Sequence, residues 1–164
     1  SLGALLSFEV ARLASAAGQP PLCVFLAACA APGRIGARPP IAGLPEAQFI
    51  AEFDRLGAIP REVLADPGLR AMALRVLRAD MTMLETYRCE SDATLACPML
   101  VLGGAEDAAA RPRDLQLWRA HAGGAFEYRE FPGGHFFVKS NETGVADHVG
   151  RRLTQLLAQE SQAP

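Results

Sequence analysis

The chain contains a serine, an aspartate and a histidine whose types could form a catalytic triad: Ser1, Asp107 and His135. A serine hydroxyl is a weak nucleophile at neutral pH and needs a base within hydrogen-bond reach. Imidazole has a suitable unperturbed pKa, and a carboxylate can fix its tautomer and stabilise the imidazolium ion. The backbone N–H of Leu2, which follows the serine at the start of a predicted helix, could stabilise an oxyanion. These residue types therefore point to nucleophilic acyl transfer.

Two of the three residues follow predicted β-strands. The segments 22–28 and 97–103 are continuously apolar, as is typical of buried parallel strands, and 126–131 alternates as a third strand. Asp107 and His135 come after the second and third of these strands. Because ligands bind at the carboxyl ends of strands in open α/β sheets, we expect both side chains at that edge.

Ser1 comes directly before a predicted helix over residues 2–17, where Gly18 is a plausible stop. We expect an apolar stripe at helical spacing to face the core. Its members are Leu2, Leu5, Leu6, Val10, Leu13 and Ala17.

Further helices are expected around the strands. Their ranges are 45–56, 66–87, 112–122 and 142–159, and the Pro- and Gly-rich segment 32–45 is expected to be a connection. Alternation of strands and helices predicts the α/β class, with a mostly parallel sheet and helices on both faces. We expect one domain over 1–164, interrupted by a helical insertion at roughly 33–92.

Composition argues against several kinds of partner. The 164 residues include 16 basic and 18 acidic side chains, so the net charge of −2 gives no electrostatic basis for nucleic-acid binding. The longest strongly apolar segment, 22–31, is too short to span a bilayer. No His, Cys, Asp or Glu set has the spacing of metal ligands, so we predict no metal and no cofactor. The cysteines, which form no C-x-x-C pair, favour free thiols in a reducing compartment; they are Cys23, Cys29, Cys89 and Cys97.

Several segments resemble those of type II thioesterases, the stand-alone α/β-hydrolases that accompany polyketide and nonribosomal peptide synthetases. The segment 1–12, SLGALLSFEVAR, is similar to the family's nucleophile elbow from the serine onward. Other segments resemble the lid helices, the acidic loop and the histidine loop: 44–57, 60–67 and 77–87, then GGAED at 103–107, then FPGGHFF at 131–137. The chain order Ser, Asp, His is also that of the α/β-hydrolase triad.

This resemblance implies the C-terminal part of an α/β-hydrolase fold with a helical lid at roughly 33–92. It implies hydrolysis of acyl thioesters on the phosphopantetheine arm of an acyl carrier protein or peptidyl carrier protein. The step would edit or release acyl chains in polyketide, nonribosomal peptide or fatty-acid synthesis. Ser1 would be the nucleophile, His135 the base, Asp107 the orienting acid and the Leu2 N–H an oxyanion donor. We expect no nucleic-acid or membrane partner, and a cytoplasmic location.

Two of these assignments have alternatives within the sequence. Glu106 competes with Asp107 for the role of the acid, because three alanines follow where the family more often has a proline and a branched residue. Ser1 is also a favoured residue type for an ordinary helix N-cap.

Three other functions are compatible with the same residues. A general carboxylesterase or lipase would use the same triad. Alternatively, Ser1 would act as an N-terminal nucleophile activated by its own α-amine. In a third interpretation, the chain is an inactive fragment or a module that binds carrier proteins.

Four further charged or titratable residues are given structural interpretations. His121 and His148 are expected on the polar faces of helices. Asp80 and Glu85 are expected to be solvated or in ion pairs.

The methionines of the insertion and one glycine pair complete the candidates. Met72, Met81 and Met83 are expected in a core, or alternatively along an adaptable acyl pocket. Gly103 and Gly104 are expected to form a turn at a strand end.

We also expect the chain to be a fragment that begins at the nucleophile, without the Gly-His that precedes the serine in the family. The strand at 22–28 would then present a bare apolar edge, which favours aggregation. The 164-residue piece alone is therefore expected to be poorly soluble or inactive.

Overall fold

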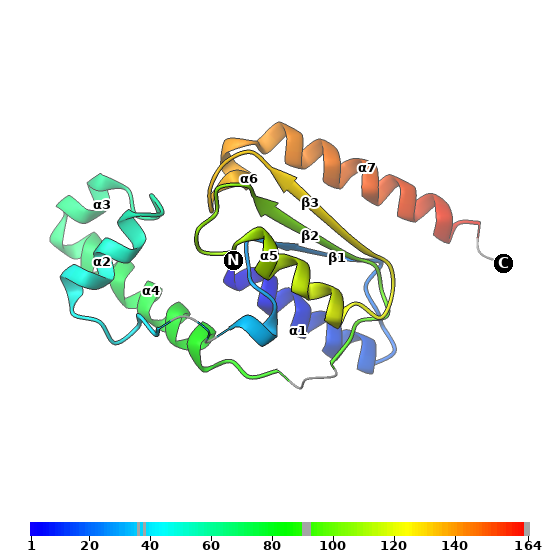
Figure 1. The fold of residues 1–164 in the computed structure, drawn as a ribbon, viewed down its shortest axis with the longest axis horizontal. Helices are drawn as coiled ribbons and strands as arrows, with labels where there is room; N and C mark the ends of the chain where they lie inside the picture. Colours follow the sequence, from blue (N-terminus) through cyan, green and yellow to red (C-terminus); the bar gives the residue numbers. More distant parts are fainter. Residues whose placement is uncertain (36, 38, 90–92, 163–164) are drawn as a thin grey trace. The chain divides into compact units, whose positions relative to one another are not determined.

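The computed structural model describes residues 1–162 except 36, 38 and 90–92 (Figure 1). The chain forms two compact units. The first comprises Ser1–Ala31 and Glu90–Pro164, and the second comprises Pro32–Cys89. The predicted triad residues all belong to the first unit.

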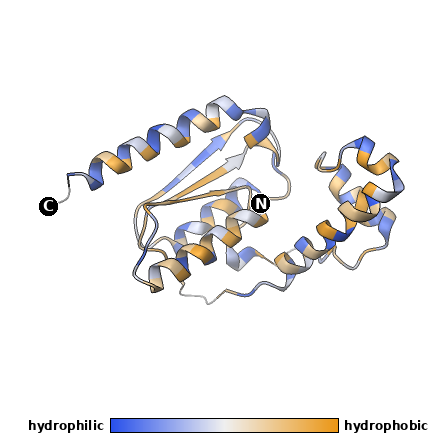
Figure 2. Ribbon diagram, turned by 180° about the vertical axis from the view of Figure 1, so that it is seen from behind, coloured by the Kyte–Doolittle hydropathy of each residue, from blue (hydrophilic) through white to orange (hydrophobic). Residues whose placement is uncertain are grey.

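The first unit is built on a parallel three-stranded sheet in the order β1-β2-β3. The strands are β1 (Val24–Ala27), β2 (Met99–Gly104) and β3 (Phe126–Phe131), so all three predicted strands are confirmed. Every residue of the central strand β2 is buried, whereas β3 is more polar and partly exposed. Figure 2 shows this contrast between the hydrophobic β2 and the hydrophilic β3.

Helices cover both faces of this sheet, as predicted (Figure 1). On one face, α1 (Leu2–Ala16) packs beside the 3-10 helix η2 (Gln116–His121), with ring centroids of Phe8 and Trp118 5.1 Å apart. On the other face, α6 (Phe137–Ser140) and α7 (Glu142–Glu160) contribute Phe137 and Val145 to a cluster with Leu102 of β2. The two faces are thus closed by separate sets of side chains, and each set includes aromatic rings.

The predicted apolar stripe of α1 is buried only in part. Leu5 is buried, but Val10 and Leu13 are 64% and 71% exposed. The helix instead buries the face that carries Ala4, Leu5, Phe8 and Ala11. The ring of Phe8 packs against Trp118 on this face, so Val10 and Leu13 turn outward. Leu6 and Val10 line a shallow apolar hollow of about 300 Å³ that extends to Val24.

The predicted helix at 112–122 is divided, and its histidine is buried. A short α5 (Pro112–Leu115) is followed by η2, in which Trp118 and His121 are buried. A 3-10 helix has three residues per turn, so Leu115, Trp118 and His121 share one inward face. The expected surface position of His121 is therefore wrong: its Nδ1 lies 2.8 Å from the Ala93 carbonyl oxygen.

His148 is also not a surface residue. Its ring meets that of Phe131 edge-on, at 5.9 Å between centroids, and its Nε2 lies 3.4 Å from the Glu127 carboxylate. The helix α7 turns this position toward β3 rather than toward solvent. Burial lowers the pKa of His148, and the Glu127 charge opposes this effect.

The second unit is helical in its described part. It contains the 3-10 turn η1 (Pro32–Arg34) and the helices α2 (Glu46–Asp54), α3 (Arg61–Ala65) and α4 (Pro67–Thr86). Asp66 caps α4, since its Oδ1 accepts a 2.8 Å bond from the Leu69 N–H, as its position before Pro67 predicted. A core forms from Phe49, Phe53, Ile59 and Leu74.

Two charged residues of α4 hold the loop that precedes α2. Glu85 accepts hydrogen bonds from the N–H groups of Ile41 and Ala42 at 2.6 and 3.0 Å. Arg78 donates to the carbonyls of Ala42 and Leu44, and its guanidinium lies 4.3 Å from the Phe49 ring centroid. The expectation of a solvated or ion-paired Glu85 is thus wrong: its partners are backbone amides.

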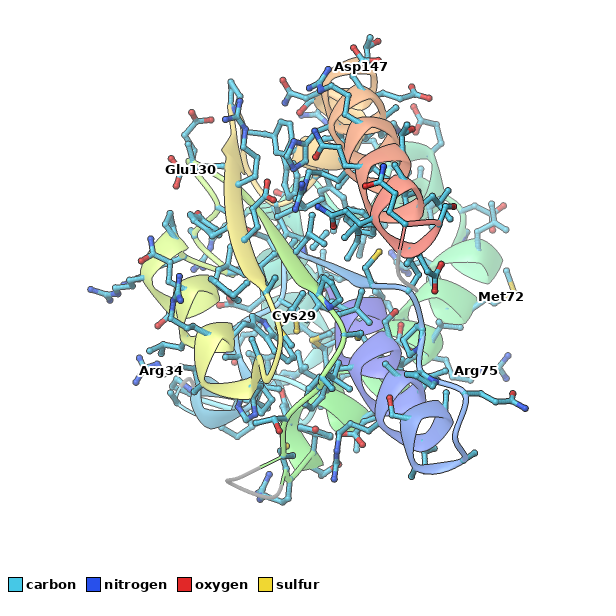
Figure 3. All side chains as sticks on the ribbon, turned by 90° about the vertical axis from the view of Figure 1, so that its right-hand side faces the viewer. Cys29, Arg34, Met72, Arg75, Glu130 and Asp147 are labelled. Atoms are coloured by element: carbon cyan, nitrogen blue, oxygen red, sulfur yellow. The ribbon has the colours of Figure 1, made fainter. Side chains whose placement is uncertain are left out.

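The methionines of α4 have different environments. Met81 packs against the core of the second unit, as predicted. Met72 and Met83 are about half exposed, at 52% and 48%, so the core prediction fails for both. Figure 3 shows the Met72 side chain projecting away from α4.

Candidate active site

Asp107 and His135 are in direct contact. The Oδ2 of Asp107 lies 2.9 Å from the Nδ1 of His135. The other carboxylate oxygen, Oδ1, accepts the N–H groups of Ala109 and Ala110 at 2.8 and 3.0 Å. Asp107 is only 2% exposed, so nearly all of its hydrogen bonding is to the protein.

These contacts determine the charge state of Asp107. Burial by itself raises the pKa of the carboxyl group, because it penalises the ionised form. The hydrogen bonds from His135, Ala110 and Ala109, with the charge of His135, outweigh burial and lower the pKa below its ordinary value. Asp107 is therefore ionised at neutral pH and acts only as an acceptor. The Nδ1 of His135 must then carry the shared hydrogen, which leaves Nε2 free to accept a proton when the ring is neutral.

Backbone hydrogen bonds fix the Asp107 loop to the His135 loop. The Ala105 N–H donates to the Phe131 carbonyl at 2.9 Å, and the Glu106 N–H donates to the Gly133 carbonyl at 3.0 Å. The loops follow neighbouring strands that are paired to their ends, at Gly104 and Phe131. The parallel sheet thus carries the acid and the histidine to the same edge.

Glycines make this close approach possible. A methyl carbon at Gly104 would overlap the carbonyl oxygen of Gly134 and lie 2.5 Å from that of Gly133. Gly133 itself has φ = +105°, a conformation that side chains disfavour. The expectation that Gly103 and Gly104 form a turn is wrong. They are the last two residues of β2. Sequence reasoning missed Gly104 as a residue that positions the site. The available signal was its place in the GGAED segment, three residues before Asp107.

Ser1 lies at the same edge of the sheet. Its main-chain nitrogen donates a hydrogen bond to the carbonyl of Ala27, the last residue of β1. Figure 1 shows the N-terminus beside the ends of the strand arrows.

The hydroxyl of Ser1 is not used for helix capping. Ser1 occupies the N-cap position of α1, but its side chain makes no capping hydrogen bond. Within the described residues, no hydrogen bond joins it to His135 either. Leu2 begins α1, where the first N–H groups have no acceptor within the helix.

Three other residues at this edge clarify the site. Glu106 is exposed, and it is Asp107 that contacts His135. Phe136, which sequence reasoning treated only as part of a motif, places its ring edge-on to His135 at 5.3 Å between centroids and is 45% exposed. Cys29 is buried in the interior (Figure 3), and burial raises the pKa of its thiol, so the thiolate nucleophile is disfavoured.

The described residues also bear on metal and membrane binding. They contain no group of three or more His, Cys, Asp or Glu side chains placed to hold a metal ion. None of the helices in the part of the chain that the structure describes is long and apolar enough to cross a membrane. The thiols of Cys23, Cys29 and Cys97 are free.

A family model described as "Thioesterase domain" matches residues 1–153 of this chain. The chain belongs to the thioesterase domain family. Among curated proteins it is 35% identical to Thioesterase TesA of Mycobacterium marinum, in an alignment that covers 86% of this chain and 56% of TesA.

Solved structures of the thioesterase domain family are close to this fold. RedJ, a thioesterase from the prodiginine biosynthetic pathway of Streptomyces coelicolor, gives a TM-score of 0.84 at 30% identity, over 92% of this chain and 60% of RedJ. BorB, a type II thioesterase from the borrelidin biosynthetic cluster, gives 0.82 at 31% identity, over 93% and 62%. These neighbours confirm the predicted α/β-hydrolase fold class and the resemblance to type II thioesterases.

The matches also define the extent of the similarity. The chain spans about half the length of the curated relatives that it matches, at 44% and 56% for two of them.

Proposed function

We propose that this chain carries the nucleophile, base and acid of a serine-dependent thioesterase that acts on acyl groups bound to an acyl or peptidyl carrier protein. The observation that carries the proposal is the 2.9 Å contact between Asp107 and His135, with the second carboxylate oxygen of Asp107 held by two backbone N–H groups. Membership of the thioesterase domain family supports the choice of a thioester as substrate.

The first half of the reaction acylates the enzyme. The Oγ of Ser1 attacks the thioester carbonyl carbon while Nε2 of His135 takes the hydroxyl proton. Asp107 holds the imidazole by Nδ1 and stabilises the imidazolium ion. The Leu2 N–H donates to the oxyanion of the tetrahedral intermediate. When the C–S bond breaks, the imidazolium returns the proton to the departing thiolate of the carrier arm.

The second half releases the acid. Nε2 of His135 takes a proton from water, whose oxygen attacks the acyl-serine carbonyl. The C–O bond to Ser1 then breaks, and His135 returns the proton to the serine oxygen. The carboxylic acid leaves, and the enzyme regains its starting state without a cofactor.

The helical unit at Pro32–Cys89 enters the proposal as a lid. We assign it to the insertion at roughly 33–92 of a single α/β-hydrolase domain, partial within 1–164. Its suggested task is to shape the acyl pocket. We also propose an editing or releasing role in polyketide or nonribosomal peptide synthesis, in the cytoplasm. Membership of the thioesterase domain family supports this role.

The test is hydrolysis of acetyl-, propionyl- and longer acyl-carrier-protein thioesters by the protein at its full natural length. We expect Ser1→Ala and His135→Ala to lower kcat by about 10³-fold or more, as for other members of a catalytic triad. Asp107→Asn should cause a large loss, whereas Glu106→Gln, the matched exposed neighbour, should retain activity.

The same assay separates the alternatives. Faster turnover of p-nitrophenyl esters than of thioesters with equal acyl chains would replace the proposal with a carboxylesterase. Carrier-protein binding without turnover, unchanged in His135→Ala, would identify a binding module.

A further inference from the structure

Asn141 stands at the start of α7 but does not cap it. Asparagine is one of the favoured N-cap residues, because its side-chain oxygen can accept a free N–H of the first helical turn. Asn141 holds the N-cap position of α7, yet its side chain makes no capping hydrogen bond. The side chain is used for a different contact.

The Asn141 amide joins the two ends of the loop that carries His135. Its nitrogen Nδ2 donates to the carbonyl of Pro132 at 2.5 Å and to that of Phe137 at 3.4 Å, and it lies 3.2 Å from the hydroxyl oxygen of Ser140. Pro132 directly follows β3 and Phe137 begins α6, so the two carbonyls bracket His135. Because both carbonyls are acceptors, the nitrogen of the amide and not its oxygen faces them. One side chain thus bridges the loop from its beginning to its end.

The loop needs such a bridge because its own backbone is adaptable. Two glycines, at 133–134, directly precede the histidine, and glycine leaves the backbone the most conformational freedom. The rings of Phe131 and Phe137 stack at 5.6 Å between centroids and anchor both loop ends in the core. Among the described residues, no other hydrogen bond reaches the Pro132 carbonyl. Asn141 therefore holds the part of the loop that lies between this anchor and the glycines.

We propose that Asn141 is a positioning residue for His135, whose amide holds the loop 132–137 so that the imidazole stays in contact with Asp107. The 2.9 Å contact between Nδ1 and Oδ2 joins side chains of two separate loops, so movement of either loop changes it. The partner of Nδ1 sets which ring nitrogen carries the hydrogen in neutral histidine. Asn141 thereby helps to keep Nε2 free to act as the base. The effect on the rate rests on the proposed function, whereas the effect on the ring does not.

The test uses two substitutions that keep a good N-cap residue but remove the amide. Aspartate and serine rank with asparagine at N-caps, and neither has two N–H donors. If Asn141 served only α7, Asn141→Asp and Asn141→Ser would behave as wild type. The control is Gln159→Glu, which exchanges an exposed amide of the same helix for a carboxylate.

Two measurements on the protein at its full natural length report the position of His135. We expect both Asn141 variants to lower kcat for an acyl-carrier-protein thioester about tenfold or more, with KM within about twofold of wild type, because a displaced base affects reaction more than binding. In ¹⁵N NMR spectra at a pH where the His135 ring is neutral, wild type should show the tautomer with hydrogen on Nδ1. Both Asn141 variants should show a mixture with the Nε2–H tautomer. Gln159→Glu should match wild type in both measurements.

Several results would overturn the proposal. Wild-type kcat or a wild-type tautomer in both Asn141 variants would show that the amide does not position the ring. An effect in Asn141→Asp alone would assign it to the added charge. Urea unfolding is measured in parallel, and loss of the folded state in both variants would make Asn141 a residue of the fold alone.

The tautomer also distinguishes failure of this inference from failure of the proposed function. If wild type hydrolyses no thioester, the proposed function fails and the NMR comparison decides the inference alone. A tautomer mixture in both Asn141 variants then supports the positioning role. The Nδ1–H tautomer in all variants removes it.

Discussion

The α-carbon of Gly104 lies so close to the carbonyl group of Gly134 that a methyl group on Gly104 would overlap the carbonyl oxygen. This contact joins the end of β2 to the histidine loop. Gly104 lies three residues before Asp107 in the chain, and Gly134 lies directly before His135. The absence of a side chain at Gly104 is therefore a condition for the 2.9 Å contact between Asp107 and His135.

A Gly104→Ala variant should lose both stability and activity. The opposing atoms belong to backbone carbonyls, which move only with the whole loop, so we expect a loss of about 1–3 kcal/mol in the free energy of unfolding. A shift of about 1 Å between the loops should lower kcat about 10²-fold. Urea unfolding and thioester turnover measure the two effects.

The matched control for this variant is Gly150→Ala in α7. A methyl carbon there would meet no atom within 4 Å. Since alanine favours a helix over glycine, we expect unchanged activity and a gain of about 0.5–1 kcal/mol. Equal stability of the two variants would show that Gly104 is not tightly packed.

Ala28 should not tolerate a branched side chain. It follows β1 with φ = +52°, in the left-handed region, and it is buried. Ala28→Val should lower the free energy of unfolding by about 2 kcal/mol or more, because a β-branched residue is strongly disfavoured there. Ala28→Gly should stay within about 1 kcal/mol of wild type, since relief of backbone strain offsets the lost methyl group. Equal urea midpoints for the two variants would contradict this.

Asp107 should make stability depend on pH in the acid range. Its pKa in the folded protein lies below its ordinary value of 3.8, so ionised Asp107 stabilises the fold at pH values above about 4. This contribution is lost as the pH falls through the folded-state pKa. The free energy of unfolding of wild type should therefore fall more steeply below pH 4 than that of Asp107→Asn.

Glu106→Gln is the control for this pH dependence. The Glu106 side chain is exposed. The free energy of unfolding of Glu106→Gln should therefore fall below pH 4 as steeply as that of wild type. An unchanged slope in Asp107→Asn would show that the carboxylate is not stabilised by its partners.

Glu85 should protect two backbone amides of the second unit from exchange. Its carboxylate accepts the N–H groups of Ile41 and Ala42. Glu85→Ala should accelerate hydrogen exchange of both amides about tenfold or more, and cost about 1–3 kcal/mol if they remain unpaired. Asp80→Ala, on the same helix, should leave both exchange rates unchanged. Equal exchange in the two variants would show that Glu85 does not hold the loop.

The sequence predicted elements best where local patterns are strong. The alternating β3 was predicted to the residue, α4 with its Asp66 cap to within one residue at each end, and the apolar run that became β2 to within two residues. Predictions from the sequence failed where tertiary packing decides which face of a helix is buried. Leu6, Val10 and Leu13 have helical spacing but face outward, because α1 packs into the core through the face that carries Phe8. His121 appeared polar on a 3.6-residue helix but is buried on a 3-10 helix.

For the candidate site, the sequence by itself determined which residue types are present and in what order: Ser1, Asp107 and His135, with glycines before the acid and the histidine. It left Asp107 and Glu106 as alternatives, because both could follow the same strand. Only the tertiary structure decided that Asp107 meets His135, since this contact depends on the pairing of β2 with β3 across 28 residues of chain.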